Sequence, residues 1–383
     1  MSLAYLDHAA TSPMRPGAVA AMLPFLTERY ANPEGSHRFA RDARRAVDEA
    51  RDQVADVLGV APGEVVFTGG GTEGDNTAIA GAGLGRGTVV VTPAAEHHAV
   101  LDAVQRTEGR VVPVTATGHV DLDALADALA PRPSGELVRL VSVMAVNNEV
   151  GTMTDLAAVS ALVRRLAPQA VLHTDAVQAA CWIDLRALTP LVDLLSLSAH
   201  KFGGPKGAGV LTVRSGTPLR ALLAGGGQER ERRSGTHNVG GIVATATALA
   251  EADAARPVEC ARVAQLKDRL LDGLTALGGV TETVPRPAAV PGIAHVCFDG
   301  VESEALLYLL DEADVCASAA SACASGAMEP SHVLAAMGVP AARAAGALRL
   351  SFGHTSAEGD VDRTLDAIAD AVSRLRRPVG VSR

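Results

Sequence analysis

The stretch VDLLSLSAHKFGGPKGAGVLTVR (192–214) places two apolar runs on either side of a glycine-rich turn that contains Lys201 and Lys206. Continuous apolar runs of this length are typical of strands that are buried on both faces of a sheet. Lys201 directly follows the first run, so we expect it at the end of a buried strand. The chain has only one other lysine, Lys267, so any lysine chemistry must use one of these three residues.

Strand-like runs of the same kind recur on the N-terminal side of this stretch. They lie at 64–68, 88–92, 110–114, 137–146 and 170–176. Helical patterns separate several of them, at 97–107, 121–130 and 155–167, with Asp121 and Asp155 as candidate N-caps. Apolar strands that alternate with helices predict an α/β fold whose sheet is largely parallel and covered on both faces.

The pattern changes after about residue 240. Two Ala/Leu-rich helices are expected near 238–255 and 259–277, followed by strands at 295–300 and 347–353, a helix from 302 and a last helix near Ser356. This order predicts a smaller α+β domain. We therefore expect a large domain at 13–250, and a small domain made of 1–12 and 251–383.

Composition limits the class of protein. The 383 residues carry a net charge of −9, which argues against direct binding of nucleic acid. The sequence shows no signal peptide pattern and no apolar run long enough to span a membrane. Five widely spaced cysteines fit neither a disulfide framework nor a metal site. The simplest interpretation is a cytoplasmic protein with reduced thiols.

Two further segments end predicted strands with polar groups. GGGTEGDN (69–76) can present backbone N–H groups to an anion at a helix start, although a simple strand-to-helix turn explains it equally well. HTDAVQ (173–178) places Asp175 where the apolar pattern predicts burial. Asp175 either caps the next helix or faces a cation in the crevice at the strand ends.

Taken together, an anion cradle, a buried acid and a lysine are the groups that pyridoxal 5'-phosphate (PLP) requires. The phosphate would bind at the helix start, Asp175 would keep the pyridine nitrogen protonated, and Lys201 would form a Schiff base. His97, in AAEHHAVLD, is a candidate to stack on the ring, with His98 as its competitor. Lys206 is expected to be structural or exposed to solvent.

The order of seven motifs resembles the cysteine desulfurases among the class V, fold type I PLP enzymes. These motifs are TGGGTEGDN, EHHAVLD, VNNEVG, HTDAVQ, SLSAHKFGGPKG, GGGQERERRSGT and SAASACASGAMEPS. The similarity extends from LDHAATSP (6–13) to ALRLSFG (347–353). The last of the seven motifs resembles the group with a long, mobile catalytic-cysteine loop, expected here at 316–331.

This resemblance implies roles for individual residues. Cys323, Lys201 and His97 would be catalytic, and Asn32, Asn148 and Arg349 would bind the substrate. The cofactor would contact Gly71, Thr72, His97, Asn148, Asp175, Gln178, Ser198, His200, Lys201 and, from the second subunit of a homodimer, Thr236. No metal ligand is implied.

The implied reaction removes sulfur from L-cysteine, releases L-alanine and leaves a persulfide on Cys323. A sulfur-acceptor protein would then take the sulfur for iron–sulfur cluster assembly, for thiolation of tRNA or cofactors, or for DNA phosphorothioation. The sequence departs from the family at Ala319 and Ala320 before the cysteine, and at His354, where an arginine is common. Cys316 is expected to be a small packed residue rather than a redox partner.

Three alternatives stay open at this point. A selenocysteine lyase would use the same groups, whereas an aminotransferase of the same fold would need no thiol. A protein of another class, a sulfur-carrying scaffold, would be active only with a partner. Release of alanine by the purified chain separates the scaffold from the enzymes.

Overall fold

The computed structural model describes residues 3–82, 85, 87–133, 135–319 and 331–376, and the backbone of two short strands at 323–324 and 327–328. Its main element is a seven-stranded sheet with the order β2-β8-β7-β6-β5-β3-β4. These strands are β2 (Val65–Thr68), β3 (Thr88–Pro93), β4 (Arg110–Val112), β5 (Leu137–Ser142), β6 (Val171–Asp175), β7 (Leu194–Ser198) and β8 (Gly209–Val213). β8 is antiparallel to both of its neighbours, and the other pairs are parallel. The predicted α/β class and largely parallel sheet are confirmed.

Both faces of this sheet are covered by helices, as the apolar strands predict. Neighbouring residues of a strand point to opposite faces, so Leu194 and Leu195 of β7 belong to two separate hydrophobic clusters. The Leu195 side is covered by α3 (Arg38–Leu58), α7 (Leu156–Leu166) and the first half of α8 (Val239–Ala276). The Leu194 side is covered by α4 (Gly71–Gly81) and α5 (His98–Gln105).

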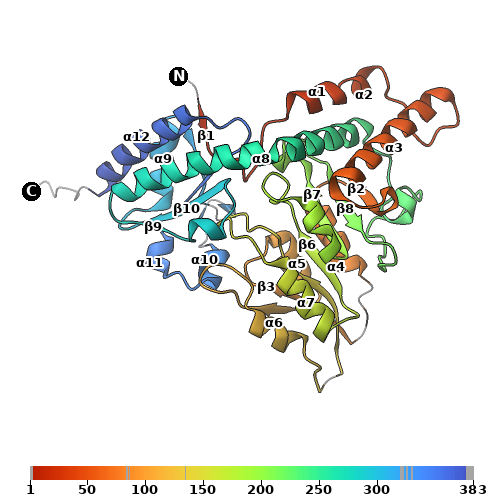
Figure 1. Cartoon of the computed structure of the whole chain (residues 1–383), viewed down its shortest axis with the longest axis horizontal. Helices are drawn as coiled ribbons and strands as arrows, with labels where there is room; N and C mark the ends of the chain where they lie inside the picture. Colours follow the sequence, from red (N-terminus) through yellow and green to blue (C-terminus); the bar gives the residue numbers. More distant parts are fainter. Residues whose placement is uncertain are drawn as a thin grey trace, which may run out of the picture.

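A smaller antiparallel sheet lies at the other end of α8 (Figure 1). Its order is β14-β10-β9, with β9 (Val280–Glu282), β10 (Ile293–Phe298) and β14 (Ala347–Ser351). The second half of α8, α9 (Ser303–Glu312) and α12 (Glu358–Leu375) pack on it in a third hydrophobic cluster. Beside it the N-terminal strand β1 (Ala4–Tyr5) pairs in parallel with β11 (Val315–Cys316). The chain start is thereby joined to the C-terminal part.

The prediction of two helices between 238 and 277 is wrong. One continuous helix, α8, spans Val239–Ala276 with Pro257 inside it. A proline inside a helix costs about 3 kcal/mol, because it removes a backbone N–H and its ring meets the preceding turn. Burial on both sides of the proline offsets this cost: residues such as Leu249 pack in one cluster and Leu270 in another.

Other boundaries differ by a few residues. β4 and β5 end earlier than predicted, at Val112 and Ser142, and the last helix begins at Glu358. Asp121 and Asp155 cap α6 and α7, as predicted. The remaining elements are α1 (Pro16–Met22), α2 (Pro24–Thr27), α6 (Leu122–Leu129), β12 (Cys323–Ala324), β13 (Ala327–Met328), α10 (His332–Ala336) and α11 (Ala341–Ala344).

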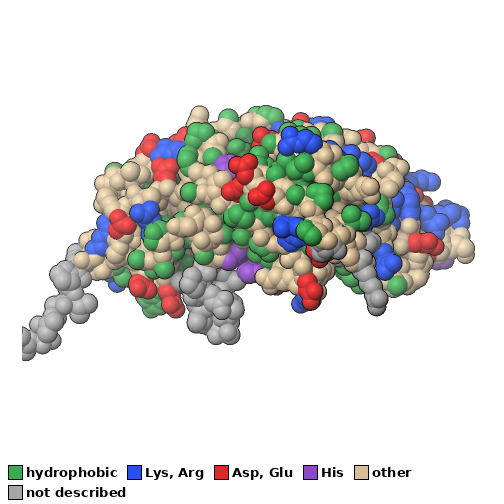
Figure 2. Space-filling view, turned by 90° about the horizontal axis from the view of Figure 1, so that it is seen from below, with side chains coloured by type: hydrophobic (Ala, Val, Ile, Leu, Met, Phe, Trp, Pro, Cys, Tyr) green, Lys and Arg blue, Asp and Glu red, His purple; other side chains and the backbone are tan. Residues whose placement is uncertain are grey.

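The charge of the surface is uneven. Figure 2 shows charged side chains of both signs, with the Lys and Arg side chains (blue) gathered toward the end of the molecule that α3 occupies in Figure 1. The exposed arginines of α3 include Arg38, Arg41, Arg44 and Arg45. Within the described residues, the structure has no helix of the length and apolarity that crossing a membrane requires.

Candidate active site

A cavity of about 350 Å³ lies where the strands of the large sheet end. Its wall is made by segments that follow β2, β3, β5, β6 and β7, and such crevices at the carboxyl ends of parallel strands commonly bind ligands. The volume falls in the range of about 300–1,000 Å³ that is usual for small-molecule sites. Ten predicted residues line it: Gly71, Thr72, His97, Asn148, Asp175, Gln178, Ser198, His200, Lys201 and Arg349.

One end of the cavity is formed by the start of α4. Gly70, before the first helical residue, has φ +147°, a conformation that favours glycine. A side chain at Gly71 would come within 2.6 Å of Val177, so the backbone at this turn lies close to the segment that follows β6. Thr72 follows in the first turn, and Ser198 lies across from Gly71. A helix start with an open glycine backbone and two hydroxyl groups is suited to an anion.

His200 borders the same end of the cavity. Its Nδ1 lies 3.2 Å from Oγ1 of Thr11. Burial lowers the pKa of His200 to about 4, and the positive charges of Lys201 and Lys206 act in the same direction. His200 is therefore neutral at pH 7, and its ring can take part in hydrogen bonds to an anion without carrying charge.

Asp175 is the last residue of β6 and is 5% exposed. Its Oδ1 accepts a hydrogen bond from the backbone N–H of Val177 at 2.9 Å. Burial raises the pKa of Asp175 to about 6, against the lowering effects of that hydrogen bond and of Lys201. A cation placed against this carboxylate would lower its pKa and stabilise the charged form. The side chain lines the cavity and caps a turn at Val177. The alternative that Asp175 caps a helix is wrong, because no helix directly follows β6 in the described chain.

Lys201 follows β7 in a short 3-10 turn and reaches the N-terminal segment of the chain. Its Nζ donates to the backbone carbonyls of Ala9 at 2.6 Å and Ala10 at 2.9 Å. Burial and, to a smaller extent, the nearby Arg349 lower the pKa of Lys201 to about 8. A lysine with a lowered pKa supplies more of the neutral amine that attacks a carbonyl.

His97 and Gln178 complete the wall beside Lys201. His97 is the N-cap of α5, and its Nδ1 accepts from the N–H of Ala99 at 3.1 Å, which leaves the proton of the neutral ring on Nε2. Burial and the charge of Lys201 lower the pKa of His97 to about 4. Gln178 donates from Nε2 to the carbonyl of Ala9 at 2.8 Å, so Gln178 and Lys201 share one acceptor.

Arg349 comes from β14 of the smaller sheet and lines the same cavity. Its Nη1 donates to the carbonyl of Asn148 at 2.9 Å, and its Nη2 donates to Oδ1 of Asp7 at 2.8 Å. The buried Nε of Arg349 has no hydrogen-bond partner among the described residues. An arginine held in place with unused N–H groups is suited to bind a carboxylate.

Two predicted residues do not line the cavity as the described chain forms it. Asn32 is exposed, and its Oδ1 accepts from the N–H of Glu34. Thr236 is also exposed, in the segment before α8. The side chain of Cys323 lies outside the described residues, although its backbone pairs with Met328 in a short antiparallel ladder.

The chain is described up to Ala319 and again from Ser331, and both of these ends contact segments that line the cavity. Ser318 and Arg349 exchange backbone hydrogen bonds of 3.1 and 2.7 Å. Ser331 caps α10 and donates to Oε2 of Glu149, the residue after Asn148. Both ends of the segment that contains Cys323 are thereby attached beside Asn148 and Arg349.

Two residues discussed in the sequence analysis, Cys316 and His354, also have defined positions in the structure. Cys316 pairs with Tyr5 at the end of β11, and burial raises the pKa of its thiol. His354 lines a second cavity of about 20 Å³ that shares Gln178 and Lys201 with the first. Its ring centroid is 6.3 Å from that of His8.

Reasoning from the sequence missed a group of buried acids around Asp175. Asp75 and Glu96 are each 1% exposed, and burial together with the charge of Asp175 raises the pKa of both. Oδ1 of Asp75 lies 3.6 Å from Nε2 of the buried His173. One signal was available for Asp75: it lies four residues after Gly71 on α4, and therefore on the same helix face.

The chain is similar in sequence and in structure to known proteins. Residues 4–364 match the family model of the class-V aminotransferases. The chain is 43% identical to an IscS-like cysteine desulfurase of Mycobacterium tuberculosis, an alignment that covers 98% of each protein. A solved structure described as a NifS-like protein has a TM-score of 0.89 and 34% identity, covering 97% of this chain and all of that one. A structure of SspA in complex with cysteine has a TM-score of 0.77 and 30% identity, over 91% of this chain and 98% of that one.

Proposed function

The chain belongs to the class-V aminotransferase family, and within it to the cysteine desulfurases. We therefore propose that it uses PLP and Cys323 to remove the sulfur of L-cysteine. The observation that carries the proposal is the meeting of Lys201 and Asp175 in one cavity whose far end is the start of α4. The similar structure of SspA contains cysteine, which supports the choice of substrate.

The residues of the cavity fit PLP. Gly71, Thr72, Ser198 and His200 would hold the phosphate, because they combine a helix start with hydroxyl and imidazole groups. Asp175 would hold the protonated pyridine nitrogen, which is the cation that its buried carboxylate requires. His97 would lie against the ring, and Gln178 would contact the phenolate oxygen. When bound there, PLP supplies an electron sink for negative charge at the substrate Cα.

Other side chains of the cavity would bind the substrate and move its protons. Arg349 and Asn148 would bind the substrate carboxylate, and Asn32 would lie near it. Lys201 would carry the cofactor between turnovers and take the proton from Cα, since its lowered pKa increases the fraction of neutral amine at neutral pH.

Sulfur transfer would be the task of Cys323. Its thiolate would attack the substrate sulfur, forming an S–S bond as the Cβ–S bond breaks, and the electron pair left on carbon would take up a proton to give alanine. Only the thiolate of Cys323 is nucleophilic, so its proton must leave before the attack. His97 would accept this proton at Nδ1 once its hydrogen bond from the N–H of Ala99 opens, since Nε2 already carries the proton of the neutral ring. Attachment of the flanking Ser318 and Ser331 beside Arg349 and Asn148 supports Cys323 as the nucleophile.

A homodimer and a protein acceptor complete the proposal. Thr236 is exposed on its own chain, as expected for a residue that contacts the phosphate in a second copy. The persulfide would pass to a sulfur-acceptor protein. A cytoplasmic location is compatible with free thiols at Cys181, Cys260, Cys297 and Cys316.

Covalent attachment of PLP should depend on pH in one direction. Only the neutral amine of Lys201 attacks the aldehyde, and with a pKa of about 8 roughly a tenth of the amine is neutral at pH 7. The attachment rate of PLP to the apoprotein should therefore rise with pH through about 8 and then level off. Stopped-flow absorbance would measure it. A rate that still rises steeply above pH 9 would show that the amine has an ordinary lysine pKa.

The test of the function is alanine release by the purified protein alone. With L-cysteine and a thiol reductant, equal amounts of alanine and sulfide are expected without any partner. Transfer of the amino group to a 2-oxo acid, in place of sulfur removal, would favour the aminotransferase. Activity that appears only after a partner is added would favour the scaffold, and a large preference for selenocysteine would favour the lyase.

A further inference from the structure

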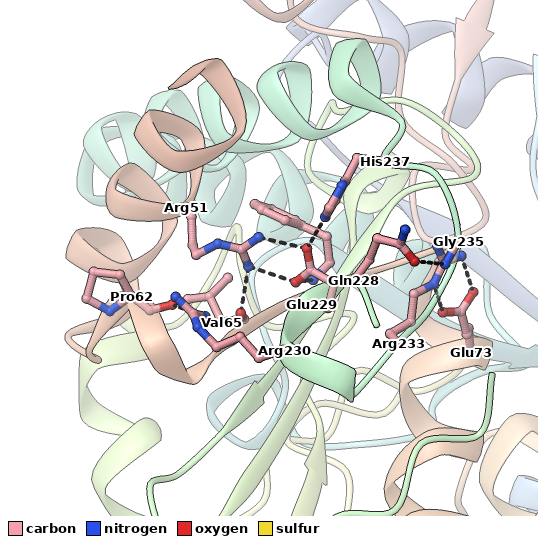
Figure 3. A network of polar contacts seen from close by, with 11 residues as sticks. Arg51, Pro62, Val65, Glu73, Gln228, Glu229, Arg230, Arg233, Gly235 and His237 are labelled. Atoms are coloured by element: carbon pink, nitrogen blue, oxygen red, sulfur yellow. Dashed lines mark hydrogen bonds and ion pairs between the residues drawn. The ribbon is translucent and has the colours of Figure 1, made fainter. Parts of the chain in front are cut away.

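The segment that carries Thr236, residues 225–238, is fastened to its own subunit by a buried carboxylate (Figure 3). Glu229 is 6% exposed. Its two oxygens accept from Nη2 and Nη1 of Arg51, each at 2.7 Å, and Oε2 also accepts from the backbone N–H of Phe67 at 2.9 Å. Oε1 accepts from Nε2 of His237 at 2.8 Å. One side chain thus joins α3, β2 and the residue next to Thr236.

A second carboxylate, that of Glu73, fastens the same segment to the start of α4, where the phosphate is proposed to bind. Oε1 of Glu73 accepts from Nε of Arg233 at 2.8 Å, while Oε2 of Glu73 accepts from the N–H of Gly69 at 2.9 Å. Within the segment, the N–H of Gly235 donates to Oε1 of Gln228 at 2.8 Å. Figure 3 shows both groups of contacts on the two sides of the turn at Glu229.

The backbone at Glu229 needs these contacts. Glu229, Arg230 and Glu231 have φ of 50°, 56° and 63°. L-residues rarely adopt this left-handed region, and three in succession are seldom found without contacts that impose the conformation. Burial alone would raise the pKa of Glu229, but hydrogen bonds from His237 and Arg51 outweigh it and hold the pKa at about 2. The carboxylate is therefore charged at neutral pH and keeps all four donors.

We propose that Glu229 is a positioning residue: by holding His237, it fixes the neighbouring Thr236 where it can bind the phosphate of PLP in a second copy of the chain. This inference rests on the proposed function, because it takes the phosphate contact of Thr236 from there. Glu229 itself touches neither the cavity nor the substrate in the described chain. Its effect should therefore concern the phosphate group of the cofactor and leave the rest of the cofactor site unchanged.

The test compares the affinity of the apoprotein for PLP and for pyridoxal, which lacks the phosphate. Glu229→Gln should weaken PLP about tenfold, the effect of one lost hydrogen bond to a charged group, and leave pyridoxal unchanged. Thr236→Ala should do the same. In the double variant the effect should be no larger than that of Thr236→Ala alone, because Glu229 acts through Thr236.

Glu231→Gln is the matched control, since the same chemical change then falls on an exposed residue of the same segment. It should leave both affinities unchanged. Additive effects in the double variant, or equal losses for PLP and pyridoxal, would overturn the inference. If Thr236→Ala itself left the PLP affinity unchanged, the proposed phosphate contact would fail first. If Glu229→Gln does not fold, Arg51→Met/Glu229→Gln removes the unpaired charge and gives the same comparison.

Discussion

Lys201→Ala should abolish both the visible absorbance that PLP gains on attachment to a lysine and the release of alanine. The chain has only two other lysines, and neither lines the cavity. Without Nζ there is no amine to carry the cofactor and no base at the substrate Cα, so activity should fall by about 10³-fold or more. Absorbance spectra of the purified protein and an alanine assay would measure the two effects.

Lys206→Ala is the matched control for this variant. Lys206 is exposed in the same glycine-rich turn, so its loss should leave the spectrum and the turnover unchanged. Thermal unfolding of both variants would show that the fold is retained. A Lys201→Ala protein that still gains the visible absorbance would mean that another group carries the cofactor.

Cys323→Ala should separate binding of L-cysteine from removal of its sulfur. The residues proposed to hold PLP and the substrate carboxylate lie on other segments, so L-cysteine should still change the spectrum of the bound cofactor. Alanine and sulfide should nevertheless not form, because no thiolate is present to accept the sulfur. Rapid-scan absorbance would follow binding, and amino-acid analysis would follow alanine.

Cys316→Ala serves as the comparison for Cys323→Ala. Cys316 pairs with Tyr5 at the end of β11, and burial raises its thiol pKa, so it is a poor nucleophile. Its loss should leave alanine release nearly unchanged. Undiminished alanine release by Cys323→Ala would contradict the mechanism and favour an enzyme that needs no thiol.

Two groups that carry the proposed chemistry, Asp175 and Lys201, could be recognised because they lie at the ends of apolar strands. Asp175 is the last residue of β6 and Lys201 follows β7, and parallel strands bring their carboxyl ends to one edge. Apolar runs also indicated the sheet itself. Both signals are local patterns in the sequence. They predict the folded structure correctly because burial of apolar strands stabilises the sheet.

The missed features depend on contacts between distant parts of the chain. Asp7 binds Arg349 only because the N-terminal segment returns beside β14. Glu229 lies in the run QERERR, which looks like a solvated charged segment until Arg51 reaches it from α3. The continuity of α8 through Pro257 likewise follows from packing at both of its ends. No local pattern in the sequence reports such contacts.

The location of the transferred sulfur decides whether Cys323 is the nucleophile. The protein is given less than one equivalent of L-cysteine without a reductant, and its peptides are examined by mass spectrometry. We expect one added sulfur on the peptide that contains Cys323 for each alanine formed. Alanine formed with no added sulfur on Cys323, or with the sulfur on Cys316, would contradict it.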